Sequence, residues 1–240
     1  MKVSTIKNIF GKYVAIGSSR KSFEKMSYSQ SGEDLIIDFI FTNYFKIVKP
    51  TYLDIGAHHP IYLSNTYLFY KKGSWGICIE PDETLFTELS MRRKNDLCLN
   101  IGVGVTERIT ADFYVMTEKT LNTFSKREAE RYQSYGTCKI EKILQVPLMH
   151  INEIICQHFP TCPNLISLDV EGLDYDILKS LDFITFRPEI FCIETLTYVQ
   201  DKTERKLTEI INLMVDNNYF VYADTYINTI FVDKVAWKSR

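Results

Sequence analysis

The sequence has 240 residues, of which 45% are hydrophobic, and its 28 Lys and Arg against 30 Asp and Glu give a formal net charge of −2. A chain of this length and composition buries a core without disulfides or structural metals, which excludes a disordered or fibrous protein. General nucleic-acid binders usually carry a basic excess, so the charge balance disfavours a nucleic-acid partner. No apolar run reaches the roughly 18 residues of a membrane span, so no transmembrane segment is expected.

The N-terminal end of the chain is basic. The first 25 residues carry six Lys and Arg and one acid, Glu24. We expect residues 1–27 to form a basic N-terminal extension, which is either a solvated end of the chain or a docking segment for an acidic partner or a membrane surface. This extension lacks the apolar centre of a signal peptide, and the six cysteines include no Cys-x-x-Cys pair. These features predict a reduced, cytoplasmic protein.

The first predicted element is a helix of about ten residues after Asp34, because Ser31 and Asp34 resemble a capping box. From residue 51 onward, short apolar runs alternate with longer amphipathic ones. The predicted strands are Tyr52–Ile55, Gly76–Ile79, Leu97–Ile101, Leu165–Leu168 and Ile190–Ile193. The predicted helices are Ser64–Lys72, Glu83–Lys94, Tyr175–Leu181 and Glu204–Asn217. Strands that are apolar on both faces and separated by helices indicate a parallel, doubly wound α/β sheet.

Two stretches interrupt this alternation. Residues 106–149 contain a strand-like run, a polar segment and a second apolar run, and we expect an insertion at the edge of the sheet, part of which could act as a lid. Near the end of the chain, Tyr219–Ala223 and Asn228–Val232 predict an antiparallel hairpin. A parallel sheet that ends in such a hairpin is an unusual combination.

The most informative string runs from Tyr52 to Pro60, where a strand ends in Asp54 and a glycine-containing turn follows. Open α/β sheets bind ligands at the edge where the parallel strands end, here called the carboxyl edge. The dinucleotide fingerprint is missing, because His58 and Ile61 stand where it requires glycine. The next strand ends in Glu80, at the position where a carboxylate accepts hydrogen bonds from a ribose diol. The pattern favours a nucleoside with a charged amino-acid tail, such as S-adenosylmethionine, over NAD.

In chain order, the motifs resemble the FkbM-type S-adenosylmethionine-dependent methyltransferases. The resemblance is carried by Ser29–Asp34, Leu53–Ala57, Ser64–Thr66, Gly76–Pro81, Leu168–Gly172 and Pro188–Glu194. It implies a class I methyltransferase (Rossmann-like) fold, with a doubly wound, mostly parallel seven-stranded sheet and an antiparallel C-terminal hairpin. Residues 28–240 would then form a single methyltransferase domain with an insertion at about 106–149. The methyl acceptor of this family is often a hydroxyl of a sugar or natural product.

The resemblance also implies the residues that bind the cofactor. They would be Asp54, Gly56, Ala57, His58, Asn65, Glu80 and Pro81, with Gln30, Glu33 and Asp34 over the methionine end. The chain departs from the family after Ala57, where many members have Asn-x-Gly and this sequence has His58-His59-Pro60. The path of this loop is therefore left open.

Three carboxylates are expected at the carboxyl edge beside the cofactor. Asp169 and Glu171 follow the fourth parallel strand, and Glu194 ends the fifth. One of them could act as the base that takes the proton of an acceptor hydroxyl, or together they could hold a divalent cation such as Mg²⁺. We favour the metal-free alternative and assign no metal ligands. His58 and His59 are rival candidates for the base, because histidine titrates near neutral pH.

The sequence thus predicts an O-methyltransferase that acts on a hydroxyl of a sugar, glycan or related natural product by in-line displacement. Asp169-Val-Glu-Gly172 lacks the proline and aromatic turn of enzymes that methylate nucleobase nitrogens, which also disfavours a nucleic-acid substrate. The alternative is a non-catalytic nucleoside-binding module of the same fold. A nucleotide-cofactor oxidoreductase is disfavoured by the missing glycines. The pattern predicts neither the identity of the acceptor nor the oligomeric state.

Overall fold

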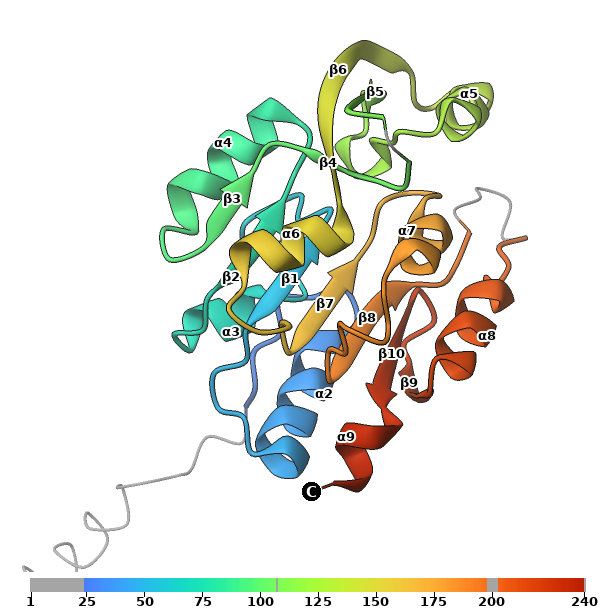
Figure 1. Cartoon of the computed structure of the whole chain (residues 1–240). Helices are drawn as coiled ribbons and strands as arrows, with labels where there is room; N and C mark the ends of the chain where they lie inside the picture. Colours follow the sequence, from blue (N-terminus) through green and yellow to red (C-terminus); the bar gives the residue numbers. More distant parts are fainter. Residues whose placement is uncertain (1–23, 107, 198–202, 240) are drawn as a thin grey trace, which may run out of the picture.

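A seven-stranded sheet forms the centre of the fold (Figure 1). Its strands are β1 (Tyr52–Ile55), β2 (Gly76–Ile79), β3 (Leu97–Leu99), β7 (Leu165–Leu168), β8 (Ile190–Glu194), β9 (Tyr219–Asp224) and β10 (Asn228–Asp233). The strand order is β3-β2-β1-β7-β8-β10-β9, and β10 runs antiparallel to both of its neighbours while β1, β2, β3, β7 and β8 pair in parallel. The expected mostly parallel sheet with an antiparallel C-terminal hairpin is confirmed.

The computed structural model describes residues 24–106, 108–197 and 203–239. Most of the predicted basic extension, 1–27, therefore lies outside the described residues. Within the described ranges, no helix has both the length and the apolar character needed to cross a membrane.

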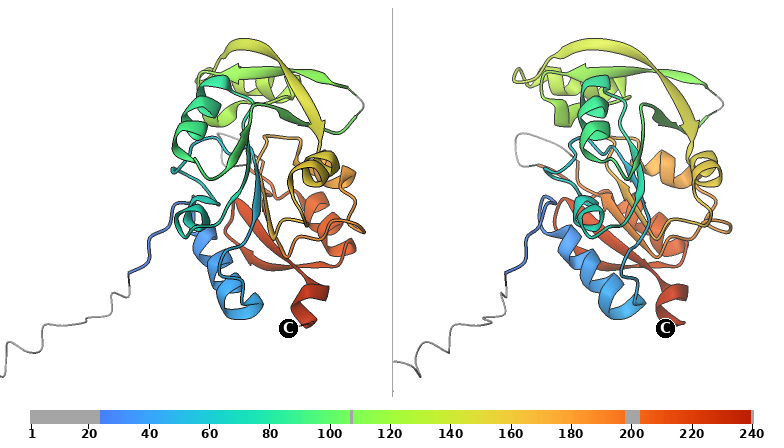
Figure 2. Two further views of the ribbon diagram at one scale, coloured as in Figure 1. Left: turned by 60° about the vertical axis from the view of Figure 1, so that its left-hand side comes forward. Right: turned by 90° about the vertical axis from the view of Figure 1, so that its left-hand side faces the viewer.

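Helices cover both faces of the sheet, as the doubly wound pattern predicts (Figure 2). One face packs against α6 (Ile151–His158), α7 (Asp174–Ser180) and α8 (Thr208–Asp216). The other face packs against α2 (Glu33–Ile40), the π-helical turn η2 (Phe41–Phe45), α3 (Tyr67–Lys71) and α4 (Glu83–Arg92), with α9 (Lys234–Lys238) beside them. All residues of β1, β2 and β7 are buried between these two layers, which explains why those strands are apolar on both faces.

Several element boundaries differ from the sequence prediction. The helix expected from Ser64 begins only at Tyr67, because the Ser64 hydroxyl accepts the backbone N–H of Tyr67 and makes a polar turn before the helix. The strand expected to reach Ile101 ends at Leu99. There the Asn100 side chain donates to the carbonyls that follow β2, and the chain leaves the sheet.

The predicted capping box before α2 is not formed. Gly32 occupies the N-cap with a φ of 90°, and no side chain caps the helix. The carboxylate of Asp34 turns back to the preceding segment instead, where it accepts hydrogen bonds from the Ser27 hydroxyl and the Tyr28 backbone N–H. Aspartate is shorter than the glutamate of a capping box, which is consistent with this different partner.

A second, three-stranded sheet covers the carboxyl edge of the large sheet. It consists of β4 (Gly102–Gly104), β5 (Thr110–Met116) and β6 (Ile140–His150) in the order β4-β6-β5, with the 3₁₀ turn η3 (Lys119–Leu121) and α5 (Lys126–Ser134) between β5 and β6. These residues include the stretch expected as an insertion, and both views of Figure 2 show them at the same end of the molecule. A small core of their own, including Tyr114, Met116 and Tyr132, holds them together.

A buried arginine after α4 connects the start of β1, the loop after β1 and the residue before α3. Arg93 is 1% exposed and forms an ion pair with Asp96, with 2.7 Å between Nε and Oδ2. A guanidinium has five N–H groups, and each has an acceptor here. The acceptors are Asp96, the carbonyl of Pro60 and the hydroxyls of Ser64, Tyr52 and Thr66.

We predict that Asp96→Ala lowers the free energy of unfolding by about 3–5 kcal/mol, because it leaves a buried guanidinium without its counter-ion. Asp38→Ala is the matched control, since Asp38 pairs with Lys72 at the surface, and it should cost about 0–1 kcal/mol. Urea denaturation followed by circular dichroism measures both. Equal losses in the two variants would contradict the importance assigned to the buried pair.

Candidate active site

A cavity of about 470 Å³ lies at the carboxyl edge, between the large sheet and the small one. The predicted site residues that line it are Gln30, Asp54, Gly56, Ala57, His58, Asn65, Glu80, Pro81, Asp169, Glu171 and Glu194. The small sheet and its turns add Phe113, Lys119, Thr120, Leu121, Asn122, Thr123 and Phe124. The loop after β8 and the turn of the C-terminal hairpin contribute Leu196, Thr197, Tyr226, Ile227 and Asn228.

The strand register explains why residues far apart in sequence meet in this cavity. Ile55, Ile79 and Leu168, the last residues of β1, β2 and β7, lie opposite one another. The residues that follow each strand therefore leave the sheet at one level. Acids placed after separate strands are brought to the same edge, as expected for an open parallel sheet.

Gly56 is required by the packing of the two loops. Its φ is +81°, and a Cβ on it would lie 1.9 Å from the backbone oxygen of Asp169. The close backbone approach that the sequence predicts at this glycine is therefore made to the loop after β7. No larger residue fits without separating β1 from the first carboxylate of that loop.

Glu80 lies buried at the end of β2 and holds the loop after β1. One of its carboxylate oxygens accepts the backbone N–H of His58 at 2.9 Å, and the other accepts that of Asp82 at 2.8 Å. Burial raises the pKa of Glu80 to about 8, although these two hydrogen bonds act in the opposite direction. Each oxygen of a carboxylate can accept more than one hydrogen bond, so both can still receive a ligand hydroxyl.

Asp54 and Asn65 form a second polar group on the cavity wall. The hydroxyl of Thr66 donates to Asp54 at 2.6 Å, and the amide nitrogen of Asn65 donates to the Ser167 hydroxyl at 3.1 Å. Burial raises the pKa of Asp54, and the bond from Thr66 opposes this rise. The amide oxygen of Asn65 is buried and has no hydrogen-bond partner, so a donor from a ligand would satisfy it.

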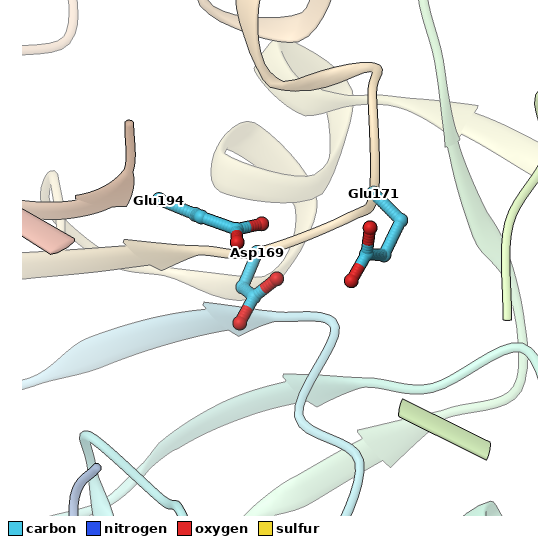
Figure 3. A group of neighbouring side chains, drawn as sticks. All are labelled: Asp169, Glu171 and Glu194. Carbon is cyan, nitrogen blue, oxygen red and sulfur yellow. The ribbon is translucent and has the colours of Figure 1, made fainter. Parts of the chain in front are cut away.

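Three carboxylates, named here the carboxylate cluster, converge on the other side of the cavity (Figure 3). Asp169, Glu171 and Glu194 each place an oxygen within 4.8 Å of the others. Glu171 has a left-handed backbone, with φ at 48°, and its carboxylate accepts the hydroxyl of Tyr132. The carbonyl of Glu171 also accepts the Thr123 hydroxyl at 2.8 Å. The segment between β5 and β6 therefore fixes the orientation of Glu171.

The carboxylates of the cluster are all harder to ionise than free side chains. Burial and the charge of Asp169 raise the pKa of Glu171 to about 8, and burial together with the same charge raises that of Glu194 well above its usual value. Solvent reaches the side chain of Asp169 through the cavity, but enclosure by the surrounding protein raises its pKa as well. Carboxylates forced this close together cannot all ionise easily.

Two of the acids predicted to bind the cofactor form hydrogen bonds with the C-terminal hairpin and the N-terminal segment instead. Glu33 and Asp34 do not line the cavity. The carboxylate of Glu33 accepts the hydroxyl of Thr225 at 2.6 Å and the amide of Asn228 at 3.1 Å, so it ties α2 to the hairpin. Burial opposes ionisation of Glu33, but these hydrogen bonds and the Ser31 backbone N–H outweigh it and lower its pKa.

The two histidines differ in their surroundings. Nδ1 of His59 accepts the backbone N–H groups of Ile61 and Tyr62, at 3.0 and 2.7 Å, and the side chain does not line the cavity. His58 does line it, and its Nε2 is buried without a hydrogen-bond partner. Burial and the neighbouring His59 lower the pKa of His58, so its ring is neutral at pH 7. Of the two rival bases, only His58 is in the cavity.

Two residues that organise the site were not predicted from the sequence. Arg93 follows α4 and Tyr132 lies in α5, and no motif surrounds either of them. Thr66 belongs to the Ser64–Thr66 string noted above, which was the available signal for its position beside Asp54. Contacts of this kind depend on elements that are distant in sequence.

The strand order, the antiparallel β10 and the acids at the ends of β1 and β2 define the class I S-adenosylmethionine-dependent methyltransferases. The family model described as "Methyltransferase FkbM domain" matches residues 54–221, which is more than half of the chain. The chain belongs to the FkbM methyltransferase family. No curated protein matches it in sequence.

Three solved structures with a similar fold are distant from this chain in sequence. A TehB-like methyltransferase from Corynebacterium glutamicum shares 9% identity at a TM-score of 0.43, covering 95% of this chain and 96% of that one. A putative methyltransferase from Listeria monocytogenes shares 10% identity at a TM-score of 0.44, covering 85% of this chain and 100% of that one. The 1,6-didemethyltoxoflavin-N1-methyltransferase from Burkholderia thailandensis shares 8% identity at a TM-score of 0.43, covering 95% of this chain and 85% of that one. At these values the assignment depends on the family match and the strand order.

The raised pKa of Glu194 predicts a stability that falls as pH rises. Between the usual carboxyl pKa and the raised one, the folded protein holds a proton that the unfolded chain has lost, so higher pH favours unfolding. Glu194→Gln removes this penalty and keeps an N–H donor for Asp169. We expect the variant to melt at a higher temperature than the wild type at pH 8, by about 2–4 °C per kcal/mol recovered, and to differ little at pH 5.

Differential scanning calorimetry from pH 5 to 8 measures this effect. Glu209→Gln, at an exposed position of α8, is the control and should leave the pH dependence unchanged. A Glu194→Gln variant that melts no higher than the wild type at pH 8 would show that the cluster carries no such strain.

Proposed function

We propose that this protein is an O-methyltransferase that transfers methyl from S-adenosylmethionine to a hydroxyl of a sugar, glycan or related natural product. The observation that carries the proposal is one cavity that joins the Asp54 and Glu80 side to the carboxylate cluster. The first side suits the cofactor, and the second suits removal of a proton from an alcohol. In this proposal, residues 28–240 act as one catalytic domain, with the small sheet covering the acceptor.

The residues on the wall of the cavity fit the cofactor. The volume falls within the roughly 300–1,000 Å³ of small-molecule sites. Glu80 would accept the two ribose hydroxyls, and Asp54 together with the free amide oxygen of Asn65 would receive the ammonium of the methionine end. Gln30 closes this end from the N-terminal side. When bound, S-adenosylmethionine supplies a methyl group activated by a sulfonium.

Glu171 is our choice for the base. An alcohol is a weak nucleophile until its proton is removed, and an ordinary carboxylate with a pKa near 4.5 is a weak base. Burial and Asp169 raise the pKa of Glu171 to about 8, which makes it a stronger proton acceptor near neutral pH. The Tyr132 hydroxyl holds the carboxylate in place, so little reorganisation is needed when the proton moves.

The carboxylate cluster also has the composition of a Mg²⁺ site, since it offers three hard oxygen donors close together. A cation held there would lower the pKa of the acceptor hydroxyl in place of a base. We favour the metal-free route, because Tyr132 already engages Glu171 and the raised pKa suits a base. The reaction rate with and without Mg²⁺ distinguishes the two routes.

The charge of the wall supports a neutral acceptor. Among the described residues that line the cavity, six are acids: Asp54, Glu80, Asp169, Glu171, Glu194 and Glu204. Lys119 is the one lysine or arginine among them, and it is paired with Glu141 outside the wall. The described wall offers a phosphodiester backbone no unpaired lysine or arginine, whereas its carboxyl groups can form hydrogen bonds with a sugar hydroxyl. The charge is therefore consistent with a glycan acceptor and does not favour a nucleic acid.

Glu80→Ala tests the cofactor assignment. At pH 9, where Glu80 is ionised, we expect the variant to bind S-adenosylhomocysteine with a free energy weaker by about 1.5–3 kcal/mol, the value of hydrogen bonds to a charged group. Isothermal titration calorimetry measures the affinity, with NAD as the negative control ligand. Glu83→Ala, at an exposed position in the first turn of α4, should bind like the wild type. Unchanged affinity in Glu80→Ala would remove Glu80 from the ribose site.

Glu171→Gln tests the base. The wild-type rate, measured with an acceptor found by screening neutral sugars, should rise with pH to a midpoint near 8, since the base must be ionised. The variant should bind S-adenosylhomocysteine normally and turn over about 10²–10⁴ times more slowly. Near-normal turnover would transfer the role to Asp169 or His58. A rate that requires Mg²⁺ and is abolished by a chelator would instead favour the metal route.

A further inference from the structure

A continuous chain of hydrogen bonds leads from the interior of the fold to the cofactor side of the cavity. Nη2 of Arg93 donates to the hydroxyl oxygen of Thr66 at 3.0 Å, and that hydroxyl donates to Oδ2 of Asp54 at 2.6 Å. Arg93 and Thr66 are both buried, at 1% and 0% exposure, and neither lines the cavity. Only Asp54, the last member of the chain, reaches the cavity wall.

The chemistry of these groups fixes the direction of each bond. A guanidinium has donors only, so Thr66 must accept from Arg93. A hydroxyl has a single proton, and an ionised carboxylate can only accept, so that proton is directed to Asp54 at 2.6 Å rather than to the Ser64 hydroxyl at 3.4 Å. Hydrogen bonds linked in this way strengthen one another in a medium of low dielectric constant. The Thr66 rotor is therefore held in the orientation that stabilises the Asp54 anion.

Asp54 needs this support because most of its surroundings oppose ionisation. Burial is the largest effect and raises its pKa, and Asp96 acts in the same direction. The thiols of Cys78 and Cys192 and the carboxyl of Glu80 also face it. Opposing them are the hydroxyls of Thr66 and Ser167 and the charge of Arg93. The Thr66 bond is the largest of the effects that lower the pKa of Asp54.

The same guanidinium fixes the loop that departs from the family pattern. Nη1 of Arg93 donates to the carbonyl of Pro60 at 3.2 Å and to the hydroxyl of Ser64 at 3.5 Å. Both contacts lie within the loop between Ala57 and Thr66. One buried cation therefore holds both the path of this loop and the side chain that supports Asp54.

We propose that Arg93 and Thr66 are positioning residues of the cofactor site: the Thr66 hydroxyl, oriented by Arg93, keeps Asp54 ionised and in place for the cationic end of the cofactor. The proposal rests on the role given above to Asp54. It assigns a cofactor-binding effect to two side chains that do not touch the cavity.

Thr66→Val tests the proposal, since it keeps the shape of the side chain and removes the hydroxyl. We expect S-adenosylhomocysteine to bind about tenfold more weakly to this variant at pH 7, as for the loss of one hydrogen bond to a charged group. The loss should be larger at pH 6 and smaller at pH 9, because Asp54 without the Thr66 bond needs a higher pH to ionise. Thr66→Ser keeps the hydroxyl and should restore both affinity and pH dependence.

Thr229→Val is the matched control, because Thr229 is equally buried and shares a hydroxyl–hydroxyl bond with Thr195 in another part of the sheet. It should lose stability without losing affinity. All variants are measured by calorimetric titration at pH 6, 7, 8 and 9, with circular dichroism to verify that each is folded. An Arg93 variant is avoided, since the loss of five hydrogen bonds would unfold the protein.

Asp54→Asn separates failure of this proposal from failure of the cofactor assignment. Weak binding in Asp54→Asn but wild-type binding and pH dependence in Thr66→Val would overturn the positioning role of Arg93 and Thr66 and leave the role of Asp54 intact. Wild-type binding in Asp54→Asn would remove Asp54 from the cofactor site. That result would overturn both the cofactor role of Asp54 and the positioning role of Arg93 and Thr66. Binding in Thr66→Ser as weak as in Thr66→Val would also overturn this positioning role, because loss of the hydroxyl would then not be the cause of the weaker binding.

Discussion

The buried ion pair between Arg93 and Asp96 is the interaction on which the rest of the site depends. A guanidinium placed in the interior is tolerated only when every N–H has an acceptor and its charge has a partner, and both conditions are met here. Meeting them draws the loop after β1, the first residue of β1 and the start of α3 to one point. The geometry of the Asp54 side of the cavity is therefore set from within the core.

The opposite side of the cavity is governed by repulsion. Asp169, Glu171 and Glu194 are held together although burial raises the pKa of each. The charge of Asp169 raises the pKa of the other two further. Such a cluster costs folding stability, and sites that store this kind of strain are often functional. In this protein the strain falls on the side of the cavity where an acceptor would lie, which is where a raised carboxyl pKa is useful to a methyltransferase.

Much of the fold could be predicted from local patterns, because strands buried on both faces must be apolar throughout. The bounds of β1, β2 and β7 agree with the prediction for this reason. Helix and strand ends were predicted less well. Asn100 ends β3 through a hydrogen bond to the distant carbonyl of Glu80. Ser64 forms a local turn with Tyr67, and Gly32 starts α2 through its left-handed backbone. The acids of the cavity wall could be predicted because each follows a recognisable strand.

The sequence by itself determined the class of sheet, the family and the strand ends at which the acids of the cavity wall stand, since periodicity and strand-end chemistry are local properties. Only the tertiary structure decided which of these acids face the cavity. Glu33 and Asp34 are used by the hairpin and the N-terminal segment, whereas Glu171 is oriented by Tyr132 of α5. The physical reason is that the protonation and direction of a buried carboxylate depend on its donors, and in this protein those donors come from distant elements.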